Sequence, residues 1–270
     1  MSAWQLAAGS MIGRSHRISG RNNQDAWYYQ QSQDGFVAVV TDGCSSGSVS
    51  EFGARLGAST LSGELSSQIE TNQGIDWGRA ERTVLTQMDV VARAMAEPYS
   101  LAIEKYFLFT IVAVAATKDQ IEVYACGDGF VAVNDAHFEL GPFPNNQPPY
   151  LAYQLIPERV QLDIGSVGLR QVWSGDVSAV DHLLIGSDGI DDLIRNQQAS
   201  RPGLTTEVGP IDQFWQSDRY FGGNPELVNR ELKLIGRDWP VQSPEHGLLS
   251  DDTTLVVARR QPDIEGEDDA

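Results

Sequence analysis

The amino-acid sequence predicts a single α+β domain. Five short runs of apolar and β-branched residues have the composition of strands, and two longer stretches between the first and second run carry apolar residues at helical spacing. Short links between neighbouring strands favour antiparallel pairing over a repeated strand-helix-strand arrangement. With 270 residues, 41% hydrophobic and 21% charged, the chain has an ordinary globular composition and can bury a sizeable core.

The predicted strands are short runs rich in apolar and β-branched residues. They cover residues 35–41, 108–114, 121–126, 182–186 and 253–258. Residues 117–120 lie between the second and third strands and indicate a hairpin turn.

Two long helices are predicted between the first two strands, over residues 50–69 and 77–96. In the first of them Phe52, Leu56, Leu61, Leu65 and Ile69 form the expected core stripe. The stripe of the second consists of Val84, Leu85, Met88, Val91, Ala92 and Met95.

A later helix is predicted from Pro225 to Gly236, with Asn224 as its N-cap. Segments 142–149 and 202–223 have loop composition, but no change in composition marks a domain boundary. We therefore expect one domain over residues 1–262, followed by an acidic, disordered tail at 263–270.

The net charge of −18, with 37 acidic and 19 basic residues, excludes several classes of partner. So acidic a surface repels nucleic-acid backbones and anionic lipid, so neither nucleic acid nor membrane is expected to bind. The first residues lack the basic and apolar regions of a secretory signal, and the longest apolar stretch, 108–116, is too short to span a bilayer. These features predict a cytoplasmic protein.

Aspartates stand where predicted strands meet loops. Asp42 ends the first strand, Asp128 and Asp188 follow the third and fourth, and Asp251 precedes the last. Asp-Gly is a common turn dipeptide, and Asp34, before the first strand, is predicted to be only a turn residue. If the strands are neighbours, the four carboxylates converge at one end of a sheet. Clustered anions favour a hard divalent cation, and an all-oxygen donor set favours Mg²⁺ or Mn²⁺.

A series of motifs then resembles the metal-dependent protein phosphatases of the protein phosphatase 2C family. The motifs occur in the family's order and span nearly the whole chain. They are Gly-Arg-Asn-Asn-Gln-Asp-Ala at 20–26, Val-Thr-Asp-Gly at 40–43, Cys-Gly-Asp at 126–128, Gly-Ser-Asp-Gly at 186–189 and Asp-Asp-Thr-Thr-Leu-Val-Val at 251–257. The resemblance implies a central antiparallel β-sandwich with helix pairs on both outer faces, and an enzyme that hydrolyses phosphoserine and phosphothreonine in proteins beside a partner kinase.

The resemblance also implies a role for each matching residue. Asp42 would bridge two metal ions, Asp188 and Asp251 would complete the first, and the Gly43 carbonyl would serve the second. Asp128, with Asp188, would hold the third ion that some members use. Asp25 would orient the attacking water, so that no protein nucleophile is needed.

Three positions depart from the family pattern. Gln24 stands where many members have Glu, as in a subgroup with Asn-Gln-Asp, and Gly20 stands where an Arg often grips phosphate. Arg21 or Arg17 is a substitute for that Arg, since a guanidinium suits phosphate. Cys44 replaces a His that is a candidate proton donor to the leaving group. His16 is a further candidate donor.

Two other functions are compatible with parts of the sequence. The departures at Gly20, Gln24 and Cys44 are also those expected of an inactive, phosphoprotein-binding module. Gly-Cys-Ser-Ser-Gly at 43–47 matches the nucleophile elbow of serine esterases, with Ser45, Asp188 and His246 in the required order. The absence of regular strand-helix alternation argues against the esterase.

Overall fold

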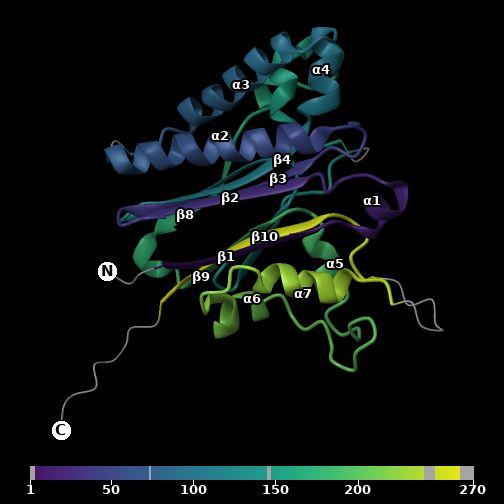
Figure 1. The fold of residues 1–270 in the computed structure, drawn as a ribbon. Coiled ribbons are helices and arrows are strands. Elements are labelled where there is room, and N and C mark those ends of the chain that lie inside the picture. Colours follow the sequence, from purple (N-terminus) through teal and green to yellow (C-terminus); the bar gives the residue numbers. More distant parts are fainter. Residues whose placement is uncertain (1–3, 73, 145–146, 240–246, 262–270) are drawn as a thin grey trace.

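The chain folds into two antiparallel sheets that pack face to face, with helices on both outer faces (Figure 1). The computed structural model describes residues 4–72, 74–144, 147–239 and 247–261. The predicted α+β class and antiparallel sandwich are confirmed, whereas the predicted tail at 263–270 lies outside the described residues. Within those residues, no helix is both long and apolar enough to cross a membrane.

The first sheet has the order β2-β3-β4-β5-β8. Its central strand β4 is buried along its whole length, because helices cover one face and the second sheet covers the other. The predicted hairpin between β4 and β5 is present, and the Thr117 amide donates to the Gln120 carbonyl at 2.8 Å. The strands are β2 (Asp25–Ser32), β3 (Gly35–Gly43), β4 (Phe109–Ala116), β5 (Gln120–Cys126) and β8 (Arg170–Asp176).

The second sheet has the order β1-β10-β9-β6-β7. Between the two sheets, Phe36 and Val112 of the first belong to the same apolar cluster as Val131, Ile185 and Val256 of the second. This shared core fixes the two sheets against each other. The strands are β1 (Trp4–Met11), β6 (Phe130–Val133), β7 (Ala136–Glu139), β9 (His182–Gly186) and β10 (Thr253–Arg260).

Helix α2 (Ser50–Thr71) lies on the outer face of the first sheet, and α3 (Trp77–Ala94) and α4 (Tyr99–Tyr106) pack against α2 (Figure 1). The predicted stripe of α2 is only partly correct, because Phe52 is 41% exposed. The N-terminal half of α2 instead approaches the sheet through small residues. A Cβ added at Gly57 would lie 2.3 Å from the Phe109 ring, so no larger residue fits at this contact.

Helices α5 (Ile190–Arg195), α6 (Gln213–Gln216) and α7 (Leu227–Gly236) cover the other sheet, and α1 (Arg14–Ser19) links β1 to β2. Helix α7 begins later than predicted, with Glu226 as N-cap, because the Asn224 side chain accepts a hydrogen bond from the Glu226 amide at 3.0 Å before the helix starts. The segment 202–223, predicted as a loop, contains α6 and a 3₁₀ turn at Asp218–Phe221.

We predict that Leu61→Ala lowers the free energy of unfolding by about 2–5 kcal/mol, because it opens a cavity between α2 and the sheet. Leu61 is fully buried, whereas Leu101 of α4 is 47% exposed. The matched substitution Leu101→Ala should change the free energy of unfolding by less than about 0.5 kcal/mol. Urea unfolding of both variants measures the difference, and equal losses would contradict this account of the core.

Candidate metal centre

The strand-end aspartates meet at one end of the sandwich. Asp42 lies at the end of β3, Asp128 in the link from β5 to β6, Asp188 directly after β9 and Asp251 just before β10. They come from both sheets, so the expectation of a single sheet edge is corrected: the first sheet supplies Asp42, and Asp128 follows its strand β5. Packing of two sheets brings together residues that are remote in the sequence.

An open cleft of about 310 Å³ occupies this end of the molecule. All of the predicted metal ligands line it, namely Asp42, Gly43, Asp128, Asp188 and Asp251. The other lining residues are His16, Cys44, Ser45, Ser46, Thr110, Gln147, Pro148, Tyr150 and Tyr153. Among the described residues, no lysine or arginine lines the cleft, so its carboxylates face one another without a cationic side chain between them.

The backbone at the strand ends leaves no room for larger residues. A Cβ added at Gly43 would lie 2.8 Å from the Ser50 Oγ and 2.9 Å from the Gln24 carbonyl oxygen. Next to Asp128, Gly127 has a φ of 95°, a conformation that side chains with a Cβ rarely adopt. The glycines of these Asp-Gly and Gly-Asp pairs are therefore required by the close packing and the backbone conformation at the cleft, and not only by a turn.

Burial raises the pKa of each of these carboxyls, and the charges of neighbouring carboxylates raise it further. Burial raises the pKa of Asp42 well above its ordinary value, and the neighbouring charges of Asp25, Asp188 and Asp251 raise it further. Desolvation in the cleft, followed by the charges of Asp251 and Asp128, raises the pKa of Asp188 to about 6. The pKa values of Asp128 and Asp251 are raised mainly by desolvation as well. A bound cation would relieve this repulsion, and carboxylate and carbonyl oxygens fit Mg²⁺ or Mn²⁺.

Asp25 lies behind the cleft rather than in its wall. It is paired directly opposite Asp42 across β2 and β3 and is only 3% exposed. Ser187 Oγ donates to its Oδ2 at 2.7 Å, whereas its buried Oδ1 has no hydrogen-bond partner among the described residues. Burial, followed by the charge of Asp252, raises the pKa of Asp25 to about 8. An unsatisfied buried carboxylate oxygen beside Asp42 is a second sign that an ion or water belongs here.

Comparison with known proteins assigns the family. A family model described as protein phosphatase 2C matches residues 12–213, well over half of the chain. The chain belongs to the protein phosphatase 2C family. Similar solved structures include PppA of Pseudomonas aeruginosa, with 18% identity, coverage of 96% of this chain and 99% of that one, and a TM-score of 0.54. Serine/threonine phosphatase Stp1 of Staphylococcus aureus has 15% identity, coverage of 97% of this chain and 96% of that one, and a TM-score of 0.53.

The catalytic domain of the serine/threonine protein phosphatase PstP has 14% identity, coverage of 96% of this chain and 99% of that one, and a TM-score of 0.51. At these identities the solved structures establish the fold and not the details of the site. Among the curated proteins no match was found.

Of the three residues that depart from the pattern of the protein phosphatase 2C family, Cys44 lines the cleft, whereas Gly20 and Gln24 do not. The Gln24 side chain is 1% exposed and donates to Ser50 Oγ at 2.7 Å, so it anchors the start of α2. Arg21 donates a hydrogen bond to the carbonyl of Ser45 and does not itself line the cleft. Arg17 donates to the Gly236 carbonyl at 3.0 Å, at the end of α7. A phosphate-binding role for Arg21 stays a prediction.

Sequence reasoning missed Asp252, which lies next to the predicted ligand Asp251. The Asp252 side chain is 1% exposed and accepts hydrogen bonds from the Gly13 and Gln24 amides, both at 2.6 Å, and from His16 Nδ1 at 2.8 Å. It thereby ties the segment before β2 to the start of β10. Asp251 and Asp252 are adjacent in one motif, and the sequence alone does not show which of the two is the predicted ligand and which is the buried anchor.

Sequence reasoning also missed Tyr150 and Tyr153, which form one wall of the cleft. Their rings pack edge to face with centroids 5.4 Å apart, and Tyr150 is 6% exposed. They follow the proline-rich segment that was predicted to be a loop, and nothing in their local pattern indicates a cleft.

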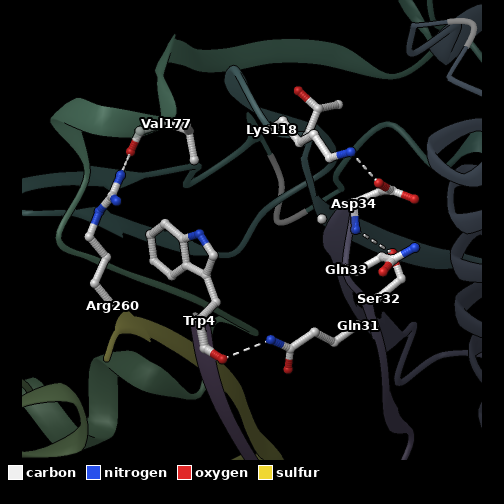
Figure 2. Close-up of a pocket in the computed structure, with 10 residues that line it drawn as sticks. Trp4, Gln31, Ser32, Gln33, Asp34, Lys118, Val177 and Arg260 are labelled. Atoms are coloured by element: carbon white, nitrogen blue, oxygen red, sulfur yellow. Dashed lines mark hydrogen bonds and ion pairs between the residues drawn. The ribbon is translucent and has the colours of Figure 1, made fainter. Parts of the chain in front are cut away.

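A second pocket, of about 300 Å³, lies at the opposite end of β3, where that strand begins (Figure 2). Trp4 points into it, and Arg260 lies over the Trp4 ring at 5.3 Å. Its lining carboxylate, Asp34, forms an ion pair with Lys118 across the pocket wall. Asp34 is thus a turn residue far from the four clustered aspartates, as predicted, and it serves as a matched control for them.

We predict that the metal-free protein loses stability as the pH rises from about 4 to about 8. Asp25 and Asp188 have pKa values of about 8 and about 6 in the folded chain, against an ordinary 3.8, so both bind their protons more tightly when folded. Their contribution to the free energy of unfolding is therefore greatest below pH 4 and is lost through this range. Urea unfolding with EDTA at a series of pH values measures it.

The variant Asp25→Asn should flatten this dependence on pH, because the amide does not ionise. Asp34→Asn, at the other end of β3, should leave the dependence as in the parent protein. A pH dependence that is unchanged in Asp25→Asn would contradict the assignment.

Proposed function

We propose that the protein is a Mg²⁺- or Mn²⁺-dependent phosphatase that hydrolyses phosphoserine and phosphothreonine in proteins. The observation that carries the proposal is the gathering of four aspartates and the Gly43 carbonyl around one open cleft, with raised carboxyl pKa values. The family assignment supports phosphate ester hydrolysis as the reaction, and PstP, whose structure was solved with 2 manganese ions, supports the class of metal.

In this proposal, Asp42, Asp188, Asp251 and the Gly43 carbonyl would hold the ions, with Asp42 common to both of them. Asp128 and Asp188 would hold a third ion. When bound, such ions lower the pKa of water and stabilise charge on phosphate oxygens. They would also supply the positive field that lets so acidic a protein accept an anionic substrate.

The residues of the chain position the reactants. We propose that Asp25, behind Asp42, orients the attacking water, and its unsatisfied Oδ1 supports this role. Arg21, bound to the Ser45 carbonyl, holds the rim where a phosphate would enter, and Tyr150 and Tyr153 limit the cleft on another side. The substrate requires a kinase that phosphorylates it, and we propose that both act in the cytoplasm.

The structure disfavours the serine esterase. In a nucleophile elbow the helix follows the serine directly, whereas here α2 begins only at Ser50, and the sheets are antiparallel rather than parallel. His246, the third member of that hypothesis, lies outside the described residues. The inactive, phosphoprotein-binding alternative is disfavoured by the same carboxylate cluster, because a site that binds only protein has no need of a metal cage.

We predict that the protein with Mn²⁺ hydrolyses a nitrophenyl phosphate and a phosphoserine peptide, and that EDTA abolishes both activities. Asp188→Asn should lower kcat/KM by more than about 100-fold, since loss of an outer-shell partner alone costs up to that factor. The control Asp34→Asn makes the same change from aspartate to asparagine outside the cleft, and it should retain full activity.

Phosphate release measures all of these reactions. Activity that survives both EDTA and Asp188→Asn would refute the proposed function. Ser45→Ala should retain activity. Its complete loss, without any dependence on metal, would instead support the esterase.

A further inference from the structure

We propose that His16 donates the proton to the leaving serine or threonine oxygen and that the buried carboxylate of Asp252 holds its ring in place. This inference rests on the proposed phosphatase function and assigns one more residue to it. His16 lines the cleft together with Asp42, Asp128, Asp188 and Asp251. It is the one imidazole that the described part of the chain contributes to that wall.

The ring of His16 is held firmly. Its side chain is 9% exposed, and its Nδ1 lies 2.8 Å from Oδ2 of Asp252, whose side chain is 1% exposed. A buried carboxylate that binds one ring nitrogen fixes both the orientation of an imidazole and the position of its proton. With Nδ1 engaged by Asp252, Nε2 is the ring nitrogen available to the cleft.

Asp252 itself has no freedom to move away. Its Oδ1 accepts from the Gly13 amide and its Oδ2 accepts from the Gln24 amide, both at 2.6 Å. Because these donors and His16 fill its oxygens, Asp252 anchors the histidine rather than reaching into the cleft. This arrangement is that of a positioned acid, in which a carboxylate orients a histidine toward the reacting group.

The charges around His16 come from three directions. Asp252 and Asp251 face it from the start of β10, and one ligand atom of each lies within 4.8 Å of the others in this group. Asp42, Asp128 and Asp188 face the same cleft from the other strand ends. On its own helix, Arg14 and Arg17 pair with Asp238 at 3.4 and 3.3 Å. A protonated ring at this place is therefore surrounded by carboxylates.

Hydrolysis forms one bond to phosphorus and breaks another. A water oxygen forms a bond to phosphorus, and the bond from phosphorus to the serine oxygen breaks. The electron pair of that bond stays on the serine oxygen, which takes the Nε2 proton of His16. The water gives one proton to solvent, and His16, neutral and still bonded to Asp252 through Nδ1, regains its proton from solvent. The products are inorganic phosphate and a free hydroxyl side chain.

Leaving-group chemistry provides the test. An aliphatic alkoxide leaves poorly unless it is protonated, whereas nitrophenolate leaves without help. In His16→Asn the side-chain amide can still donate to Asp252, but the proton at Nε2 is lost. With Mn²⁺ present, kcat for a phosphoserine peptide should fall by roughly 10²- to 10⁴-fold, and kcat for nitrophenyl phosphate by less than about threefold. His137→Asn, in exposed β7 outside the cleft, is the matched control and should change neither.

Two further readouts do not depend on catalysis by the variant. Calorimetric titration with Mn²⁺ should give the same affinity for His16→Asn as for the parent, because His16 is not proposed as a ligand. In the parent protein, kcat for a series of aryl phosphates should depend only weakly on the pKa of the leaving phenol. A steep dependence would overturn the proposal even if the variant fails to fold.

Equal loss of activity toward both substrates in His16→Asn would overturn the proposal, and weakened Mn²⁺ binding with that loss would make His16 a metal ligand instead. Retention of full activity toward the phosphopeptide would also overturn it. If the parent protein with Mn²⁺ hydrolyses neither substrate, the proposed function fails and the role of His16 falls with it.

Discussion

Electrostatic repulsion among carboxylates at one end of the sandwich is the constraint on which the rest of the structure depends. Asp25, Asp42, Asp128, Asp188 and Asp251 are held close together, and the pKa of each is raised by burial first and by neighbouring carboxylates second. Such a cluster persists only if the scaffold that carries it cannot relax. Two sheets with a shared apolar core provide that rigidity, because moving one aspartate away would require a buried strand to shift.

A second layer of contacts fixes the chain around the cluster. Asp252 joins the segment before β2 to the start of β10, and Gln24 joins the same segment to the start of α2. These contacts explain one departure from the family pattern, the glutamine at position 24. Gln24 is a buried anchor, because its side-chain amide donates to Ser50 Oγ and its backbone amide donates to Asp252. His16 is held by the same anchor network and faces the cleft from its edge.

The strongest elements could be predicted from sequence, because β3, β4, β9 and β10 are buried over most of their length and therefore carry runs of apolar residues. In β5, buried apolar residues alternate with more exposed ones. Strands β2, β7 and β8 escaped prediction because solvent covers much of each, so their residues are polar. The five predicted metal ligands all line the cleft, since strand ends carry their own signal in Asp-Gly pairs. Asp252, Tyr150 and Tyr153 were not identifiable, because their positions depend on how distant segments pack and not on local pattern.

The central claim is that the clustered carboxylates form a cage for divalent cations, and its most direct measurement is anomalous X-ray scattering from crystals grown with Mn²⁺. The account predicts two strong peaks in the cleft, both within coordination distance of Asp42, with Asp188 and Asp251 around one and the Gly43 carbonyl beside the other. Absence of any peak at saturating Mn²⁺, or peaks that contact none of these residues, would contradict it.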